Sequence, residues 1–126
     1  MAATINATIK SETANSFVTL TEANTYFETV PDSSTWTNKT DDQKNRSLIA
    51  ATRWIETLVF YGDRCDESQA LKFPRTNYQV DGVELACSTI PLNIKYAQYE
   101  LARALANDTD AITGTSGKEE ISKKQN

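Results

Sequence analysis

The stretch of residues 41–60 constrains the fold more than any other part of the sequence. Its apolar residues recur at helical spacing, and others lie off the main stripe, so that only a narrow strip with Arg53 and Glu56 is polar. A helix that is apolar over most of its circumference packs at the centre of a bundle or between subunits. We therefore expect a mainly helical protein built around this helix. The stripe is Leu48, Ala51, Thr52, Ile55 and Val59, and the apolar residues off it are Ile49, Trp54, Leu58 and Phe60.

Local signals set the boundaries of the expected elements. Thr40 followed by Gln43 is a capping-box pattern, and Gly62 is placed to end the same helix. A first helix over 21–30 is predicted from Thr21 as its N-cap to Pro31, and a third over 91–106 from Pro91 at its first turn. The third helix is expected to bury Ile94, Ala97, Leu101, Ala104 and Leu105.

A β-hairpin is expected between the last two helices. Asp81-Gly82 lies between two β-prone triplets, 78–80 and 83–85, which is a strong signal for a two-residue turn. The patterns together predict a mainly α fold: a small bundle of three to four helices with a short β-hairpin and extended N- and C-terminal arms. We expect a core with its N-terminal arm over 1–108 and an extended tail over 109–126.

Composition excludes several classes of function. The 126 residues contain no histidine, which removes the usual acid/base group at neutral pH and the commonest transition-metal ligand. No nucleophile–base pair stands out, so we predict that the protein is not an enzyme and holds no cofactor. Cys65 and Cys87 are read as small buried hydrophobes that fit a reducing compartment, with a single bridge as the less favoured alternative. We also expect no signal peptide and no membrane span.

Charge argues against a protein dedicated to nucleic-acid binding. Thirteen basic and seventeen acidic residues give a net charge of −4, whereas non-specific binding depends on Lys and Arg that neutralise phosphates. A local basic patch remains compatible with this balance. The acidic residues of 63–84 match no metal-binding spacing and are interpreted as surface acids, so no metal site is predicted.

Tyr96, Tyr99 and Arg103 lie on one side of the predicted third helix, opposite Ile94 and Leu105. A second face of two tyrosines and an arginine is typical of protein–protein interfaces, so we predict a subunit interface there. The alternative is tyrosines that merely cover surface, with the arginine stacked on one of them. Trp54, which lies off the main stripe of its own helix, is assigned to the same kind of interface.

A second cluster combines arginines with aromatic residues. Such a cluster is compatible with a stacking platform for single-stranded nucleic acid. The favoured interpretation is structural: Phe73 and Pro74 cover the end of the second helix, and Arg75 pairs with a carboxylate. The members of the cluster are Arg53, Arg64, Arg75, Trp54, Tyr61, Phe73 and Tyr78.

Four segments, taken in their order along the chain, resemble a known family of proteins. They are 16–27, the run 60–64 (Phe-Tyr-Gly-Asp-Arg), the run 71–75 (Leu-Lys-Phe-Pro-Arg), and 90–105, which opens with Ile90-Pro91. In this order they resemble small head–tail connector (adaptor) proteins of tailed bacteriophages, some of which are labelled DnaT-like single-stranded-DNA-binding. The resemblance covers residues 16–106.

The resemblance implies a structural role in the virion. Such adaptors are made in the cytoplasm of the bacterial host and form a homo-oligomeric ring, a dodecamer, beneath the portal at the head–tail interface of the neck. The implied partners are the portal protein, tail, nozzle or stopper proteins, and double-stranded DNA that passes through the lumen without specific binding. An acidic lumen would repel phosphate, which fits the net charge of −4. A role in replication as a single-strand binder is the alternative.

The tail is expected to dock on the portal if the resemblance holds. Residues 109–126 are polar and have little apolar content with which to fold alone. Contact would then depend on charged side chains. They are Lys118, Glu119, Glu120, Lys123 and Lys124.

Overall fold

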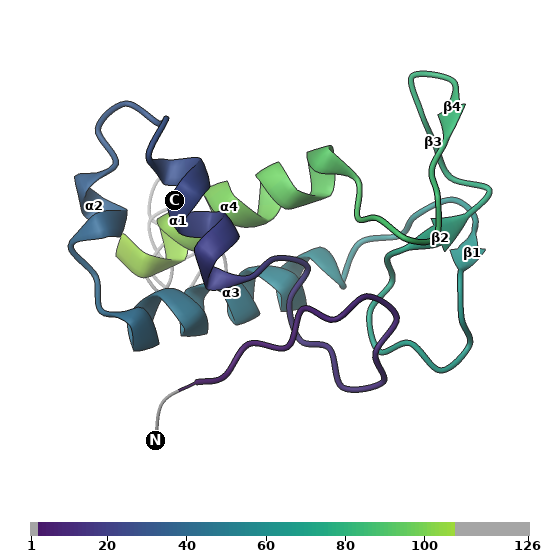
Figure 1. The fold of residues 1–126 in the computed structure, drawn as a ribbon, viewed down its shortest axis with the longest axis horizontal. Coiled ribbons are helices and arrows are strands. Elements are labelled where there is room, and N and C mark those ends of the chain that lie inside the picture. Colours follow the sequence, from purple (N-terminus) through teal and green to yellow (C-terminus); the bar gives the residue numbers. More distant parts are fainter. Residues whose placement is uncertain (1–2, 108–126) are drawn as a thin grey trace, which may run out of the picture.

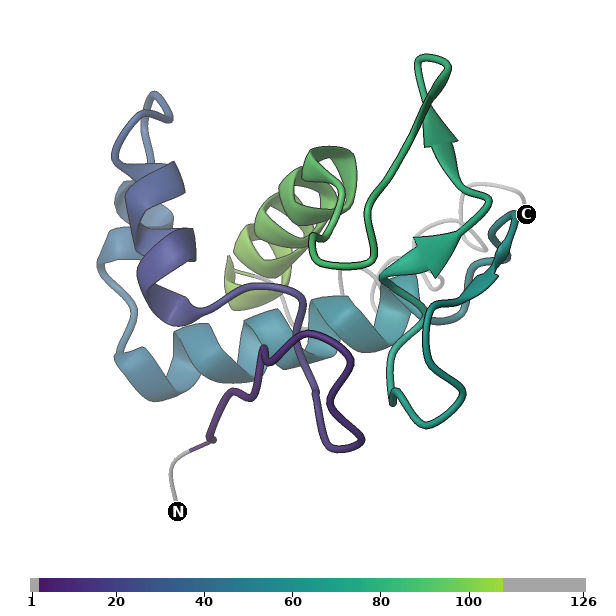
Figure 2. The same ribbon diagram turned by 45° about the vertical axis from the view of Figure 1, so that its right-hand side comes forward.

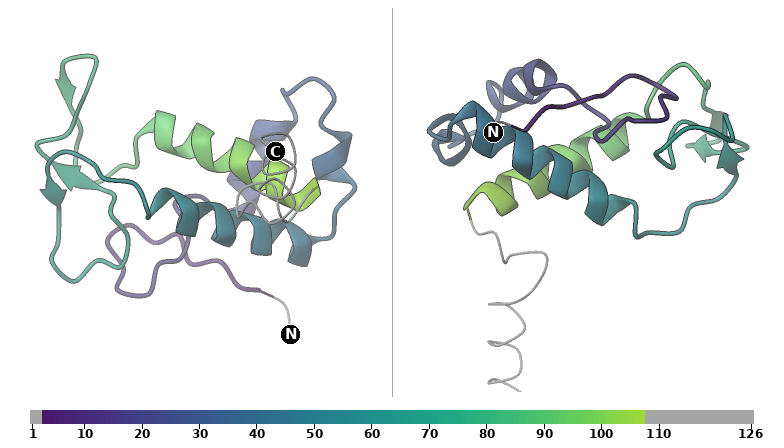
Figure 3. Two further views of the ribbon diagram at one scale, coloured as in Figure 1. Left: turned by 180° about the vertical axis from the view of Figure 1, so that it is seen from behind. Right: turned by 90° about the horizontal axis from the view of Figure 1, so that it is seen from below.

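The computed structural model describes residues 3–107, and this part of the chain is mainly helical, as predicted. Helices α3 (Asp41–Ile55) and α4 (Leu92–Asn107) form the largest contact between elements and lie side by side (Figures 1 and 3). Helices α1 (Leu20–Phe27) and α2 (Ser34–Thr37) lie at one end of this pair, and the strands lie at the other. The expected bundle of three to four helices is confirmed.

Helix α1 begins one residue earlier than predicted, because Thr19 rather than Thr21 is its N-cap. The Thr19 hydroxyl accepts a hydrogen bond from the Glu22 backbone N–H, and the Glu22 carboxylate accepts one from the Thr19 N–H. The helix ends at Phe27 instead of residue 30. Thr19 and Thr21 are the same residue type, but only Thr19 has a glutamate three residues later, so it alone forms the two reciprocal bonds of a capping box.

Helix α3 begins as predicted and ends earlier than predicted. Thr40 and Gln43 form the expected capping box. The helix stops at Ile55 rather than Phe60, and the carbonyl groups beyond it are bound by side chains from the following loop: the Lys72 ammonium donates to the Leu58 carbonyl at 2.6 Å. These side-chain donors replace the intrahelical bonds that a longer helix would have made.

The core lies between the helices and includes one polar side chain that the sequence analysis missed. Gln98 of α4 is fully buried; its amide nitrogen donates to the Ser16 hydroxyl and the Leu48 carbonyl, and its oxygen accepts from the Phe17 N–H. The buried face of α4 is therefore different from the predicted stripe, since Ala97 is exposed and Leu101 and Ala104 are half-buried. Its buried residues are Ile94, Gln98, Tyr99, Ala102 and Leu105.

Two short antiparallel strand pairs follow α3. Strand β1 (Asp63–Arg64) pairs with β2 (Arg75–Thr76), and β3 (Gln79–Val80) pairs with β4 (Val83–Glu84) around the predicted Asp81-Gly82 turn. The hairpin prediction is confirmed, and the hairpin projects away from the helices (Figure 2). Phe73–Pro74 is a cis peptide bond.

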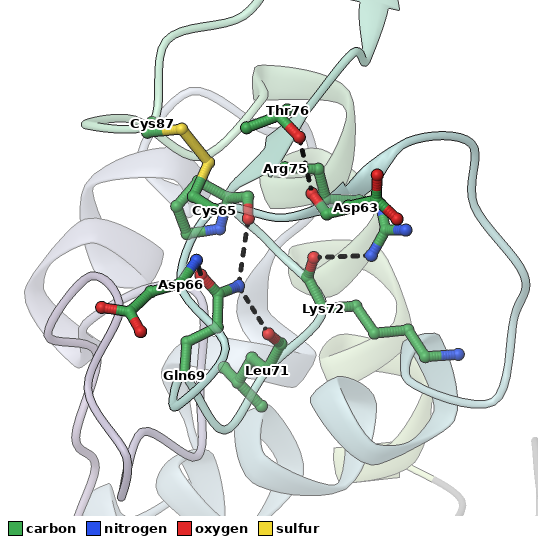
Figure 4. The surroundings of a disulfide bond; sticks show 10 residues. Asp63, Cys65, Asp66, Gln69, Leu71, Lys72, Arg75, Thr76 and Cys87 are labelled. Atoms are coloured by element: carbon green, nitrogen blue, oxygen red, sulfur yellow. Dashed lines mark hydrogen bonds between the residues drawn. A yellow bond between two sulfur atoms is a disulfide. The ribbon is translucent and has the colours of Figure 1, made fainter.

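A disulfide joins Cys65, next to β1, to Cys87, beyond the hairpin (Figure 4). The favoured interpretation of these cysteines as two unpaired hydrophobes is therefore wrong. The β1–β2 pair and the hairpin bring together two residues that are far apart in sequence, which spacing alone does not indicate.

The N-terminal arm, residues 3–19, has no regular secondary structure and runs along the helices. The Ala3 N–H donates to the Asp42 carboxylate at 2.6 Å, and the Asn45 side chain donates to the Ala3 carbonyl at 3.0 Å. Within residues 3–107, no helix has both the length and the apolar content that a membrane crossing requires.

Candidate functional site

Apolar and aromatic side chains are exposed where helix α3 ends. Val59 and Tyr61 are 93% and 87% exposed, and Trp54 and Leu58 are both 39% exposed. We call these four residues and the exposed Arg53, which precedes Trp54 on α3, the α3-end surface. The predicted long helix would have placed Val59 on its buried stripe, so the early end of α3 creates this surface.

Cations lie around the α3-end surface, and most of them are already engaged. Arg53 is exposed and makes no polar contact within residues 3–107, whereas Arg64 donates to the Leu71 carbonyl at 3.3 Å and Lys72 to the Leu58 carbonyl. Among the predicted cluster residues Arg53, Arg64 and Arg75, only Arg53 therefore has its full hydrogen-bonding capacity available in the described part of the chain.

Arg75 is a structural residue. Its guanidinium donates to the Tyr61 carbonyl at 2.8 Å, to the Lys72 carbonyl at 3.0 Å, and to the carbonyls of Phe60 and Gly62. The expected pairing with a carboxylate is wrong, because three backbone carbonyls of the turn after α3 and the Lys72 carbonyl converge on this side chain. Arg75 thus fixes the backbone that carries Val59 and Tyr61.

Glu56 contributes a carboxylate beside these cations. It accepts a hydrogen bond from the Lys72 N–H at 2.8 Å. Burial raises the pKa of Glu56 above its ordinary value, although that hydrogen bond and the nearby positive charges oppose the shift. A negative Glu56 lowers the net positive charge available to a phosphate group at this end of α3.

Phe73 belongs to the core and not to a stacking platform. It is buried, its ring lies edge-on to Phe60 at 4.7 Å and to Tyr78 at 5.0 Å between centroids, and Phe17 packs on it as well. The predicted covering of the helix end by Phe73 and Pro74 agrees with their burial. Of the aromatic residues in the predicted cluster, Trp54 and Tyr61 are the exposed ones.

The predicted tyrosine face of α4 is a contact with α1. Tyr99 is only 5% exposed and stacks on Tyr26 with 4.4 Å between ring centroids. The prediction that Tyr99 lies on a second exposed face of the helix is therefore wrong, because α1 covers this side chain. Tyr96 remains 48% exposed, while Arg103 pairs with Glu100 at 2.7 Å and lies over the Phe27 ring.

An open groove lies between α1 and α4. It is lined by Tyr26, Leu92, Tyr96 and Tyr99, and an ion pair of 2.9 Å between Lys95 and Glu22 crosses its floor. Burial alone would raise the pKa of Glu22, but hydrogen bonds from Lys95 and Thr19 bring it below its ordinary value. The subunit interface predicted for Tyr96, Arg103 and Trp54 stays a prediction.

A family model matches residues 1–125, nearly the whole chain, and its description is "Putative DnaT-like ssDNA binding protein". The chain belongs to this DnaT-like family. No curated protein and no solved structure matches the chain.

Membership of the DnaT-like family agrees with the DnaT-like label that some proteins of the resembled family have. It does not by itself point to a bacteriophage adaptor. The predicted portal-docking residues lie outside the described residues. They are Lys118, Glu119, Glu120, Lys123 and Lys124.

No cluster of potential metal ligands occurs in the described residues 3–107 of this DnaT-like protein. The site residues that sequence reasoning brought together are split by the fold into a buried aromatic group and an exposed surface. Val59 and Leu58 were missed as surface residues. The sequence signal for their exposure is the pair of cations Lys72 and Arg75. Their long side chains bind the carbonyls of Leu58 and Tyr61 just after α3, where a longer helix would have used its own N–H groups.

Proposed function

We propose that the protein binds single-stranded DNA at the α3-end surface, with Trp54 and Tyr61 as stacking groups and Arg53 as the phosphate contact. The exposed aromatic side chains beside an available arginine carry this proposal. Base–aromatic stacking tolerates any sequence because every base has a π-face. Membership of the DnaT-like family supports the same class of ligand.

The charge of the protein determines what kind of binding is expected. The net charge is −4, and Arg75, Lys72 and Arg64 each donate to backbone carbonyls, which restricts how far these cations can reach towards a phosphate. Few phosphates can then be neutralised, and log Kobs for single strands falls with log salt by about 0.7 for each phosphate neutralised. We therefore expect stacking to dominate, with a salt slope of about −1.

Fluorescence anisotropy with a labelled oligonucleotide tests this proposal. Trp54→Ala and Tyr61→Ala are each expected to weaken binding by about 1–3 kcal/mol, because each removes one stacking partner. Arg53→Gln is expected to make the salt slope shallower by about 0.7. Tyr96→Ala is the matched control, since it removes a half-exposed tyrosine from another surface.

The proposal fails if the wild-type chain does not bind oligonucleotides, or if Tyr96→Ala weakens binding as much as Tyr61→Ala. Tyr61→Ala and Arg53→Gln should retain the wild-type free energy of unfolding to within about 0.5 kcal/mol, as substitutions of exposed side chains usually do, whereas Trp54→Ala removes a side chain that is only 39% exposed and should cost more. A loss of binding without a loss of stability then reports on the surface itself.

A second candidate function is the virion adaptor that the phage resemblance implies. The observation that favours it is the exposure of Leu58 and Val59, since aliphatic side chains contribute little to base stacking but are common at subunit contacts. In this proposal the protein forms a ring at the neck of the virion, binds the portal through residues 109–126, and presents a docking surface for tail or nozzle proteins. We also propose that it has no catalytic activity.

The mass of the native particle discriminates between the two functions. An adaptor is expected to form a ring, alone or with its portal, and Val59→Asp should abolish it by placing a charge in the contact. A single-strand binder is expected to stay small, with Val59→Asp affecting oligonucleotide affinity but not mass. A stable ring combined with no oligonucleotide binding would favour the adaptor.

A further inference from the structure

The Cys65–Cys87 disulfide holds a segment that has few other attachments. We call residues 78–89 the hairpin arm; it contains β3, β4 and Cys87, and it projects from the body of the protein (Figure 2). Most of its side chains are exposed, including Val83. An isolated two-stranded hairpin is at best marginally stable in water.

Within residues 3–107, the hydrogen bonds of the hairpin arm are all internal. The Leu85 N–H donates to the Tyr78 carbonyl at 3.0 Å, the Thr89 N–H donates to the Ala86 carbonyl at 3.4 Å, and β3 pairs with β4. Tyr78 is the one arm residue of the described chain that packs against the core, through Phe73 and Phe60. On the far side of the hairpin, the restraints are the disulfide and the buried Ile90, which follows the arm directly, so the disulfide is the restraint that lies within the arm itself.

The segment to which the arm is tethered is fixed independently. The Cys65 N–H donates to the Pro74 carbonyl at 3.1 Å, and the buried Gln69 side chain donates to the carbonyls of Leu71 and Pro74 (Figure 4). Arg75 holds the preceding turn through backbone carbonyls. Loss of the disulfide would leave these contacts in place.

We propose that this disulfide is a redox-controlled tether: its reduction releases the hairpin arm while the helical core and the α3-end surface stay folded. Both cysteines are partly exposed, so a dithiol reductant has access to the bridge. One thiolate of the reductant attacks a bridge sulfur to give a mixed disulfide, and its second thiol then closes the reductant's own disulfide. Two electrons and two protons are transferred, and Cys65 and Cys87 become thiols. This inference is independent of the proposed function.

Hydrogen exchange measured by mass spectrometry tests the proposal on the full-length chain, with and without dithiothreitol. Amides that donate within the arm, such as that of Leu85, are expected to exchange at least about tenfold faster after reduction, because the hairpin opens more often. Amides of α3 and α4 should be unaffected. The double variant Cys65→Ser with Cys87→Ser should exchange like the reduced protein, and dithiothreitol should not change it.

Three results would overturn the tether. The first is exchange in the arm that is the same in both redox states. The second is a loss of structure beyond the arm, seen as faster exchange through α3 and α4 or as a double variant that does not fold, which would mean that the bridge stabilises the whole domain. The third is a native protein that resists reduction by excess dithiothreitol. In that last case the bridge is permanent and carries no switch.

Discussion

At the scale of single residues, two glycines with similar backbone angles have different roles. Gly62 and Gly82 adopt φ values of +78° and +80°. A Cβ at Gly62 would lie 2.0 Å from the Thr76 carbonyl oxygen, whereas a Cβ at Gly82 would meet nothing within 4 Å. Gly82 only supplies a turn, but Gly62 also allows β2 to approach the chain after α3.

The glycine pair gives a matched comparison. Gly82→Ala is expected to cost about 1 kcal/mol of unfolding free energy, because only the left-handed backbone is penalised. Gly62→Ala should cost at least about 3 kcal/mol, since the backbone around β1 and β2 must also move apart. Chemical denaturation measures both, and equal costs would show that the close approach at Gly62 is not maintained in solution.

Gln98 is the second residue with a specific expectation. Gln98→Met keeps the approximate volume but leaves the buried Phe17 N–H without its acceptor, while the Leu48 carbonyl keeps only the Thr52 hydroxyl as a side-chain donor. A buried group without its hydrogen bond costs about 1–3 kcal/mol, so we expect a loss of about 3 kcal/mol. Gln79→Met, on the exposed hairpin, is the control and should change stability by less than about 0.5 kcal/mol.

At the scale of elements, the contact between α1 and α4 predicts how stability depends on pH. The Tyr26 hydroxyl donates to the Glu100 carboxylate at 2.6 Å, which raises the pKa of Tyr26 to about 12, and burial raises the pKa of Tyr99 to about 12. Both phenols hold their protons more tightly in the folded protein than in the unfolded chain, where the pKa of tyrosine is about 10. Their stabilisation is present below pH of about 10 and is lost as pH rises towards 12.

Denaturation midpoints measured across this pH range check the expectation. Tyr26→Phe and Tyr99→Phe should each flatten part of the alkaline decline, because each removes one of the linked protons. A decline that is identical in both variants and in the wild type would mean that other groups cause it.

The element boundaries that depend on neighbouring residues in the sequence could be predicted. The boundaries that depend on contacts with residues farther along the chain could not. The Thr40/Gln43 box and the Asp81-Gly82 turn are local, and both appear as predicted. The end of α3 depends on Lys72 and Arg75, which follow it along the chain and bind the carbonyls of Leu58 and Tyr61 just beyond the helix. Helix α2 was missed, because a four-residue helix has no periodicity to detect.

At the scale of the whole molecule, the described residues contain a core to which all four helices contribute. Helices α1 to α4 bury their apolar faces against one another, and Phe17 and Val18 of the N-terminal arm pack into the same core. A chain that ends after Asn107 is therefore expected to retain its fold, with an unfolding free energy within about 1 kcal/mol of the full-length value. Calorimetry of the two chains measures this, and a clear loss of cooperativity in the shorter chain would show that residues beyond 107 belong to the core.

The candidate site was predictable in its residue types but not in its arrangement. Arg53 and Trp54 are exposed, as a functional surface requires, whereas Phe73 and Tyr99 are buried among other aromatic rings. The sequence does not distinguish a helical tyrosine that is exposed to solvent from one that is covered by another helix. Only the position of α1 decides between the two for Tyr99.

The bonds of Gln98 also determine when the protein can fold during its synthesis. They join α4 to Ser16 and Phe17 across 82 and 81 positions of the chain, and to Leu48 across 50. Until α4 has left the ribosome, the N-terminal arm and α3 lack the helix that covers their shared core. A nascent chain that stops before Leu92 is expected to keep Phe27, Trp36 and Leu48 accessible to chaperones and proteases, so the core is completed only after α4 has left the ribosome.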